Sequence, residues 1–271
     1  MVGTTEASTA GIMANPVARE KLQGLVVVVT GASRGIGAGL ASRCAELGMR
    51  VGMCARKRPE PPIGAEISRV VARSADVRDS ADLEHFGAAV VERFGRIDLW
   101  VNNAGVAEPI GKLADVDPGM FTHQILVNVV GVANGTSTFV RHVRRREGGG
   151  VLLNLSSGAA TTSYPGWAGY CASKSAVDML TAVVAKEEAD RGLRAYAVSP
   201  GRVDTTMHTH IRAASPESFP AVSQFLDQKA AGRFNSVRWV SDAFLEIAFG
   251  DSAFASGSVL RVPDEWEAHE S

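Results

Sequence analysis

The sequence predicts a single α/β domain in which a doubly wound parallel sheet carries helices on both faces. Short β-branched and apolar runs alternate with longer helical patterns from Leu25 to Val262, and strands that are apolar throughout are typical of parallel sheets covered on both sides. The first run leads directly into a glycine-rich turn that opens a helix. This arrangement is typical of the Rossmann type of dinucleotide-binding fold.

The boundaries of the elements follow from the same patterns. Gly48 stands where the C-cap glycine of the first long helix belongs, and Pro118 stands near the start of the longest helical pattern, where proline is well tolerated. The expected strands are residues 25–29, 50–55, 70–75, 97–101, 151–155, 193–198 and 258–262, and the expected helices are residues 35–47, 80–94, 118–143, 167–191 and 236–249.

Three segments do not follow this alternation. Residues 1–21 have no period and no signal-peptide pattern, so we expect a disordered leader that precedes one domain at 22–271. Three prolines within residues 58–62 exclude a helix where the crossover after the second strand begins. Residues 206–235 contain much Ala, Ser and Pro, which suits a mobile lid over a substrate.

The composition excludes several classes of protein. With 28 basic and 29 acidic residues, the chain has no excess charge for gripping nucleic acid or an anionic membrane. The longest apolar run, residues 25–29, is far shorter than the roughly 20 residues of a membrane span. Three cysteines cannot all pair and match no metal spacing, which favours a reduced cytoplasmic location.

Two stretches contain residues that could bind nucleic acid or a metal, but their spacing favours no such role. The basic run at residues 141–146 ends a long helix, where cations offset the helix dipole and are expected to stay solvated. His208 and His210 are two residues apart, and no carboxylate spacing completes a zinc site with them. We therefore expect no bound metal and no nucleic-acid partner.

The turn after the first strand reads Thr30-Gly-Ala-Ser-Arg-Gly-Ile-Gly37. Glycines at these places permit a tight turn, let backbone N–H groups approach a pyrophosphate, and let the helix pack close to the sheet. The helix N-terminus then faces the negative charge. The residues expected to bind a cofactor here are Gly31, Ser33, Arg34, Gly35, Ile36 and Gly37.

The end of the second strand favours NADPH over NADH. Dinucleotide sites for NADH usually place an acidic residue there to hold the ribose 2′-hydroxyl, but this chain has Ala55 followed by Arg56. Arg56 and Arg34 are suited to a 2′-phosphate because guanidinium groups bind phosphate through two parallel hydrogen bonds. Lys57 is either a further phosphate ligand or a solvated loop charge, whereas Arg58 is expected to be solvated.

Tyr170 and Lys174 are four residues apart near the start of a helix, so their side chains lie on one face. A phenol has an ordinary pKa near 10, and a neighbouring ammonium would lower that pKa and make proton exchange with an alcohol or carbonyl feasible. Ser157 follows the preceding strand, and its hydroxyl is placed to hold the substrate oxygen.

In order and spacing these motifs resemble the short-chain dehydrogenase/reductase family over residues 22–263. The stretches that carry the resemblance are 30–37, Asn102-Asn-Ala-Gly105, Asn128, Ser157, Tyr170 with Lys174, and Pro200-Gly-x-Val-x-Thr205. The resemblance implies that Tyr170 is the general acid in reduction. It implies that Lys174 lowers the pKa of that phenol and binds the nicotinamide ribose.

The resemblance also assigns roles to other positions. Ser157 would orient the carbonyl, and Asn128 would anchor a water that relays protons to Lys174. Asp76 and Val77 would contact the adenine, and Asn103 would lie at the strand edge beside the cofactor. The segment around the nicotinamide would contain Pro200, Gly201, Val203 and Thr205, with Thr205 on the carboxamide.

Within the family, the second half of the chain is similar to sepiapterin reductase and the related benzil reductases. The likeness lies in residues 166–174, 178–180, 200–207 and 256–257, and in the ending Val262-Pro-Asp-Glu265, where most members have Val-Asp-Gly-Gly. It implies that Asp264 anchors the substrate, although a solvated tail residue is the equal alternative. Trp167 is either a pocket wall or core. The expected substrate residues are Ser157, Trp167, Tyr170, Met207 and Asp264.

These observations together predict an NADPH-dependent carbonyl reductase that acts on a small ketone or 1,2-dicarbonyl compound. A reductase or dehydrogenase for acyl, steroid or sugar alcohols is the alternative with the same fold, and a non-catalytic NADP(H)-sensing protein is a third hypothesis. The family resemblance further implies a homodimer or homotetramer in which helices 118–143 and 167–191 pair across subunits.

Overall fold

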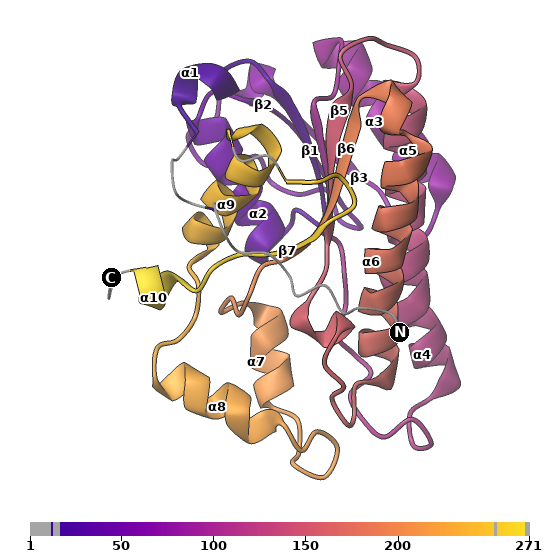
Figure 1. Cartoon of the computed structure of the whole chain (residues 1–271), viewed down its shortest axis with the longest axis vertical. Helices are drawn as coiled ribbons and strands as arrows, with labels where there is room; N and C mark the ends of the chain where they lie inside the picture. The colour runs from indigo at the N-terminus through magenta and orange to yellow at the C-terminus, as the bar shows by residue number, and fades with distance from the viewer. Residues whose placement is uncertain (1–11, 13–16, 252–253, 269–271) are drawn as a thin grey trace.

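The computed structural model describes residues 12, 17–251 and 254–268 and contains one seven-stranded sheet (Figure 1). All neighbouring strands are parallel, in the order β3-β2-β1-β4-β5-β6-β7. The direction of the strand order reverses between β1 and β4, which confirms the doubly wound prediction. The strands are β1 (Val26–Thr30), β2 (Arg50–Ala55), β3 (Val70–Ser74), β4 (Leu99–Asn102), β5 (Gly150–Leu155), β6 (Leu193–Ser199) and β7 (Val259–Arg261).

Helices cover both faces of this sheet. In Figure 1, α2 and α9 lie on one side of the strands, and α3, α5 and α6 lie on the other. Each layer encloses its own apolar cluster, and the alternating side chains of the strands contribute to both clusters. The covering helices are α2 (Gly35–Glu46), α3 (Ser80–Phe94), α4 (Pro118–Ile125), α5 (Gly131–Val143), α6 (Ala168–Glu187) and α9 (Val237–Phe249).

Two expected helices have different bounds from those predicted. The pattern over residues 118–143 is divided by a π-helical segment, Leu126–Val130, which joins α4 to α5 without a break in the helical path. Helix α6 ends at Glu187, and the residues predicted to continue it form a separate 3₁₀ turn, Ala189–Arg191, before the left-handed Gly192. Hydrophobic periodicity does not distinguish these variants because all of them advance by a similar angle per residue.

The beginning of the chain lies mostly outside the described residues, so the predicted leader can be compared at only a few positions. Helix α1 (Arg19–Leu22) begins inside the predicted leader, and its Leu22 is buried in the core. The ordered domain therefore starts somewhat earlier than residue 22. After β2, the proline-rich crossover contains a single 3₁₀ turn, Ile67–Arg69, before β3, which confirms the irregular connection that was predicted.

The segment predicted as a lid contains two helices, α7 (Thr206–Arg212) and α8 (Val222–Ala230), which lie below the sheet in Figure 1. Asp204 joins them, because its carboxylate binds Arg212 at the end of α7 and Lys229 near the end of α8. We call residues 204–234 the lid.

The basic run at the end of α5 is exposed to solvent at Arg141, Arg144 and Arg145, as predicted, but some of its side chains also make specific contacts. Arg144 pairs with Glu188, whose side chain is only 3% exposed, and Arg146 donates to the Ile97 carbonyl at 2.7 Å. His142 accepts a hydrogen bond from the Ile97 N–H. These contacts form because the run lies over the amino ends of β4 and β5, where buried carboxylates need cations.

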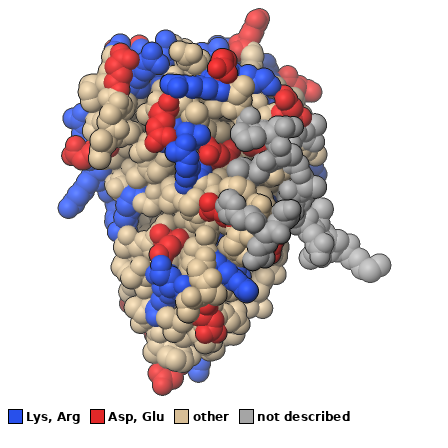
Figure 2. Space-filling model, turned by 90° about the vertical axis from the view of Figure 1, so that its left-hand side faces the viewer, with Lys and Arg blue, Asp and Glu red and all other residues tan. Residues whose placement is uncertain are grey.

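The distribution of surface charge and the character of the helices can be compared with the composition-based expectations. On the face drawn in Figure 2, basic and acidic side chains are interspersed and do not separate by sign. Within the described residues, no helix combines the length and the apolar character that crossing a membrane requires.

Candidate active site

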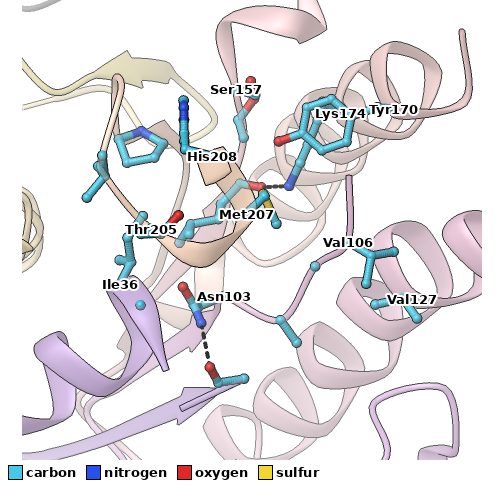
Figure 3. Close-up of a pocket in the computed structure, with 18 of the residues that line it drawn as sticks. Ile36, Asn103, Val106, Val127, Ser157, Tyr170, Lys174, Thr205, Met207 and His208 are labelled. Atoms are coloured by element: carbon cyan, nitrogen blue, oxygen red, sulfur yellow. Dashed lines mark hydrogen bonds between the residues drawn. The ribbon is translucent and has the colours of Figure 1, made fainter. Parts of the chain in front are cut away.

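A cavity of about 900 Å³ opens at the carboxyl ends of the parallel strands. Every strand from β1 to β7 contributes its last residue or the loop that follows it, and the lid closes the opposite side. Ligands of doubly wound sheets bind in this position, outside the carboxyl ends at the reversal of strand order. Figure 3 shows the middle of the cavity, with Ile36 and Asn103 at one end and Tyr170, Lys174 and Ser157 at the other.

The glycine loop forms the floor of one end of the cavity. Gly31 and Gly35 have left-handed backbone angles, with φ of 66° and 59°, which glycine adopts at little cost. A Cβ on Gly31 would lie 2.7 Å from the Ala104 Cα, so the loop approaches the next strand more closely than any side chain allows. Gly37 does not line the cavity; a Cβ there would lie 2.4 Å from the Asn103 amide nitrogen, which explains its role in packing α2 against the sheet.

The first turn of α2 suits an anion such as a pyrophosphate. Helices α3, α4 and α9 have their first-turn N–H groups capped by Asp79, Asp117 and Ser236. Helix α2 begins at the cavity after an extended Arg34, and among the described residues no side chain caps it. Its first N–H groups are therefore left for a ligand, as expected for the residues that hold a dinucleotide phosphate.

Asn103 ties the glycine loop to the end of β4. Its amide nitrogen donates to the Thr30 and Gly31 carbonyls at 2.8 and 3.2 Å, and the Thr30 hydroxyl accepts from the backbone N–H groups of Asn103 and Ala104. Thr30 is 1% exposed. The floor of the cavity is thus fixed by hydrogen bonds that the Thr30 and Asn103 side chains make with backbone groups.

At the far end of the glycine loop the cavity is lined by cations and by the loop after β3. Arg34, Arg56 and Lys57 line it, together with Asp76 and Val77, whereas Arg58 is not part of the lining that the described residues form. The Asp76 carboxylate binds Arg78 at 3.0 Å, and this hydrogen bond lowers the pKa of Asp76. The last residue of β2 is Ala55, so no carboxylate stands at that strand end.

Helix α6 brings Tyr170 and Lys174 to the cavity wall on one face (Figure 3). The Lys174 amine lies 5.7 Å from the centre of the Tyr170 ring and donates to the Leu155 carbonyl at 2.7 Å. Ser157 follows β5 and caps a short 3₁₀ turn, Gly158–Ala160, by accepting from the Ala159 N–H. The three side chains therefore meet at the carboxyl end of β5.

The ionisation of this group differs from the sequence-based expectation. Burial raises the pKa of the Tyr170 phenol to about 12, with the Ser157 side chain acting in the opposite direction. Burial also lowers the pKa of the Lys174 amine to about 8. The expectation considered only the neighbouring ammonium, but desolvation penalises the charged form of both groups and dominates here.

Asn128 lies in the π-helical segment and is fully buried. Its amide exchanges two hydrogen bonds of 2.9 Å with the backbone of Val106 and donates to the Ser173 hydroxyl. It does not itself line the cavity among the described residues. A Cβ on Gly105 would lie 3.4 Å from the Asn128 oxygen and 4.0 Å from the Lys174 amine, so this glycine keeps the space between the two open. A part for Asn128 in proton relay stays a prediction.

The loop after β6 forms the wall opposite Tyr170. Pro200, Gly201, Val203 and Thr205 all line the cavity, and Asn235 fixes the turn by donating to the Pro200 carbonyl at 3.1 Å. The Thr205 methyl lies close to the glycine loop, since a Cβ on Gly35 would be 3.4 Å from it. This loop and the glycine loop thus approach each other over the middle of the cavity.

An aromatic cluster forms the remaining end, where the lid meets the body of the protein. The Trp167 ring lies 4.6 Å from that of Tyr170 and 4.8 Å from that of Phe219, centre to centre. Trp167 both lines the cavity and belongs to this cluster, so the two alternatives left open for it are not exclusive. Sequence reasoning identified Met207 here and missed four further lining residues, which are Tyr164, His208, Ile211 and Phe225.

His208 is one of these missed residues, and its chemistry is unusual for a cavity wall. Burial lowers its pKa to about 4, so the imidazole is neutral at pH 7. Its ring lies between those of Phe225 and Phe234, at 5.8 and 5.4 Å. Of the four missed residues, Phe225 had a local signal, because it lies three residues after Val222 on the buried face of α8.

Asp264 is the expected substrate residue that the structure does not bring to the cavity. Its carboxylate binds Arg261 at 3.0 Å and is 11% exposed, and within the described residues Arg261, but not Asp264, lines the cavity. The ending that resembles sepiapterin reductase therefore presents an arginine to the cavity, because the carboxylate turns towards the nearest cation on β7.

Comparisons with known proteins agree with this site. The family model described as short chain dehydrogenase matches residues 25–216. The 3beta-hydroxysteroid dehydrogenase 1 of Eggerthella lenta is 32% identical over 90% of this chain and 97% of its own length. A benzil reductase ((S)-benzoin forming) of Bacillus cereus is 29% identical over 88% of this chain and 99% of its own length.

Among solved structures, the chain is similar to a 3-ketoacyl-(acyl-carrier-protein) reductase from Brucella melitensis complexed with NADH. The TM-score is 0.74 at 29% identity, and the match covers 89% of this chain and 97% of that one.

Proposed function

Because the chain belongs to the short-chain dehydrogenase family, we propose that it is a reductase that transfers hydride from NADPH to the carbonyl carbon of a small apolar ketone or 1,2-dicarbonyl compound. Membership makes it an oxidoreductase that acts between an alcohol and a carbonyl with a nicotinamide cofactor. One observation carries the proposal. Tyr170, Lys174 and Ser157 meet in a cavity whose other end is formed by the glycine loop and the uncapped start of α2.

The residues of this chain divide the reaction between them. Bound NADPH would supply the hydride. The Ser157 hydroxyl holds the carbonyl oxygen, and the Tyr170 hydroxyl gives its proton to that oxygen as negative charge develops there. The Lys174 ammonium stabilises the phenolate that is left. The Trp167 ring and the lid exclude water from the reacting atoms.

The raised pKa of the Tyr170 phenol suits its proposed part as the proton donor in carbonyl reduction. With a pKa raised to about 12, Tyr170 is protonated at neutral pH and ready to donate. Oxidation of an alcohol would require the phenolate, which is the form that burial disfavours. Reduction therefore begins from the protonated phenol, which is the form that Tyr170 has at neutral pH.

Arg34 and Arg56 support NADPH as the cofactor. Both line the end of the cavity beyond the glycine loop, and the position where an acid would hold a 2′-hydroxyl is Ala55. The similar reductase from Brucella melitensis was solved in complex with NADH, so the proposal of NADPH rests on the residues of this chain. Here the two guanidinium groups are the features that favour a 2′-phosphate.

The lining of the lid end supports an apolar substrate. Trp167, Met207, Ile211 and Phe225 surround the space beside Tyr170, and His208 is neutral there. Aryl ketones and diketones fit such a wall better than sugars, which need many polar partners. A steroid alcohol or ketone remains the competing apolar substrate, in view of the hydroxysteroid dehydrogenase among the relatives.

We also infer a cytoplasmic homodimer or homotetramer. Met179 and Val183 on α6 and Met120 on α4 are large apolar side chains that are 66, 45 and 50% exposed. Helices that expose such residues side by side are suited to pairing across subunits.

The proposal is tested by a panel of carbonyl compounds assayed with NADPH and NADH in parallel, using wild type and Tyr170→Phe. The panel contains benzil, a small aliphatic 1,2-diketone, a 3-ketosteroid, a 3-ketoacyl thioester and an aldose. We expect NADPH-dependent turnover of the diketones and a loss of about 10³-fold or more in kcat for Tyr170→Phe.

NADPH binding, followed by fluorescence, should be unchanged in that variant because the phenol is not needed to hold the dinucleotide phosphates. Appreciable activity in Tyr170→Phe would contradict the acid assignment. Faster turnover of thioesters or steroids than of any diketone would contradict the substrate class. NADPH binding without turnover of any panel member would instead support a non-catalytic NADP(H)-sensing protein.

A further inference from the structure

A third polar side chain follows Tyr170 and Lys174 along α6. Asp178 comes one helical turn after Lys174, so residues 170, 174 and 178 follow one another along the same side of the helix. Neither the cavity lining nor the roles discussed above include Asp178, although its side chain is mostly buried.

The surroundings of Asp178 are short of hydrogen-bond partners. Its Oδ1 atom is buried and has no hydrogen bond within the described part of the chain, and the same holds for the Oγ atom of Ser156. Ser156 follows β5 directly and is 3% exposed. Burial raises the pKa of the Asp178 carboxyl, and the nearby Ser156 side chain acts in the opposite direction.

Lys174 needs a negative charge nearby. Its side chain is 6% exposed, and its amine donates a hydrogen bond to a neutral acceptor, the Leu155 carbonyl. A buried ammonium without a counter-charge loses its proton at a much lower pH than one in water. Asp178 lies one helical turn further along the same side of α6, and its negative charge opposes this loss for Lys174.

The other groups around Lys174 do not supply that charge at neutral pH. Tyr170 on the same helix is a protonated phenol, Asn128 on the π-helical segment carries a neutral amide, and Ser156 and Ser157 after β5 carry hydroxyls. Two opposing effects therefore set the protonation state of the Lys174 amine. Its burial favours the neutral form, and the Asp178 carboxylate favours the charged form.

We propose that Asp178, near the Ser156 hydroxyl, is a positioning residue that keeps the buried Lys174 amine in its charged form. The inference rests on the proposed function, in which the Lys174 ammonium stabilises the Tyr170 phenolate. Asp178 touches neither substrate nor cofactor, and it acts through Lys174. The ammonium can then persist at neutral pH in a site that is otherwise apolar enough to exclude water.

The test compares Asp178→Asn, which keeps the shape and removes the charge, with Asp178→Glu, which restores the charge. Asp190→Asn, an exposed aspartate just beyond the same helix, is the matched control. The first readout is the titration of the Lys174 side chain in the protein alone, followed by NMR of ¹³C-labelled lysine and assigned with Lys174→Arg. We expect Asp178→Asn to lower the pKa of Lys174 by about one unit, while Asp178→Glu and the control leave it near that of wild type.

The second readout is the pH profile of carbonyl reduction. In Asp178→Asn the decline of kcat on the alkaline side should move by about one unit towards lower pH. KM for the ketone should stay within about twofold, because the carboxyl lies outside the cavity. An unchanged Lys174 titration in Asp178→Asn would overturn the proposal, and so would an equal shift in Asp190→Asn.

The two readouts separate this inference from the proposed function. If wild type reduces no carbonyl compound, the proposed function fails, while the NMR titration still decides whether Asp178 controls the charge of Lys174. If Asp178→Asn does not fold, Asp178→Ser serves instead. It also removes the charge, so the pKa of Lys174 should fall by about one unit and the alkaline-side decline of kcat should move by the same amount towards lower pH. An unchanged Lys174 titration in that variant would overturn the proposal.

Discussion

The two ends of the cavity are built by different kinds of interaction. The end beneath the glycine loop is held by hydrogen bonds between backbone groups and the side chains of Asn103 and the 1%-exposed Thr30. The lid end is held by packing between side chains, chiefly the rings of Trp167, Phe219 and Phe225, together with an exposed contact between His210 and Glu108. Because hydrogen bonds fix direction as well as distance, whereas apolar packing is not directional, we expect the first end to be the more rigid of the two.

This difference suits the two ligands proposed for the cavity. A dinucleotide is the same molecule in every turnover, and a rigid cradle of backbone N–H groups binds its phosphates without reorganisation. A carbonyl substrate must come and go past a lid, and lid opening requires contacts of modest strength. Substitutions at the two ends should therefore fail in different ways.

The largest effect is expected at the cofactor end. Gly31→Ala adds a Cβ 2.7 Å from the Ala104 Cα at a left-handed backbone position, and the two penalties together should cost about 2–4 kcal/mol of stability. We expect NADPH affinity to fall at least a hundredfold, measured by fluorescence titration, together with a lower thermal midpoint.

The control for this variant is Gly64→Ala, which has the same left-handed backbone (φ of 77°) but open space around the new Cβ. It should lose only the smaller stability that backbone strain costs and should bind NADPH normally. Normal NADPH binding by Gly31→Ala would show that the glycine loop is not the rigid cradle inferred here.

The cofactor end is also the part that the sequence predicts best. Its signals are local, because a β-branched strand, a left-handed glycine and a helix start follow one another within residues 26–37. The alternation of apolar runs likewise predicts the sheet, since burial on both faces leaves little freedom in strand composition. Parallel strands then bring Asn103 and Ser157 to one edge without further information.

The lid end could not be predicted in the same way. Trp167 and Phe225 are far apart in the sequence, and their contact depends on how α8 packs against the start of α6. No short motif encodes that packing, so Tyr164, His208 and Phe225 were missed. The contact between the Asp264 carboxylate and Arg261 could not be predicted either, because motif position alone does not specify orientation. A part for Asp264 in anchoring the substrate stays a prediction.

The ionisation of Tyr170 could be predicted from the sequence only in part. The sequence correctly places an amine one turn away, but it does not give the burial of either group. Burial proves larger than the influence of the amine, and the pKa of the phenol rises to about 12. Distances along a helix can be read from spacing, whereas desolvation depends on the whole fold.

An intermediate effect is expected for the cations at the cofactor end. Arg56→Ala removes a guanidinium that lines the cavity, and a charge-assisted hydrogen bond is worth about 1.5–3 kcal/mol. We expect KM for NADPH to rise at least tenfold, with KM for NADH within about twofold of wild type. Arg58→Ala, whose side chain is not part of the described lining, should leave both values unchanged. An equal rise of KM for both cofactors would contradict a 2′-phosphate contact.

A smaller effect, confined to the substrate, is expected at the lid. Phe225 lines the cavity and is 8% exposed, and Phe225→Leu should raise KM for an aryl diketone several-fold, to about tenfold, because an aromatic pair is worth about 0.5–1.5 kcal/mol. NADPH affinity should not change. Phe234→Leu, which packs against Arg212 within the lid but does not line the described cavity, is the control. A loss of NADPH affinity in Phe225→Leu would mean that the two ends are coupled.

The smallest effect is expected for the ion pair that joins the lid to the loop after β4. His210 and Glu108 meet at 2.9 Å with side chains that are 54 and 41% exposed, and exposed pairs of this kind are worth at most about 1 kcal/mol. Glu108→Gln should therefore change substrate KM by no more than about fivefold. At a pH where His210 is protonated, 0.5 M salt should produce a similar change in wild type, because exposed charges are screened. A much larger or salt-independent effect would mean that polar contacts fix the lid as firmly as they fix the glycine loop, and the contrast between the two ends of the cavity would no longer hold.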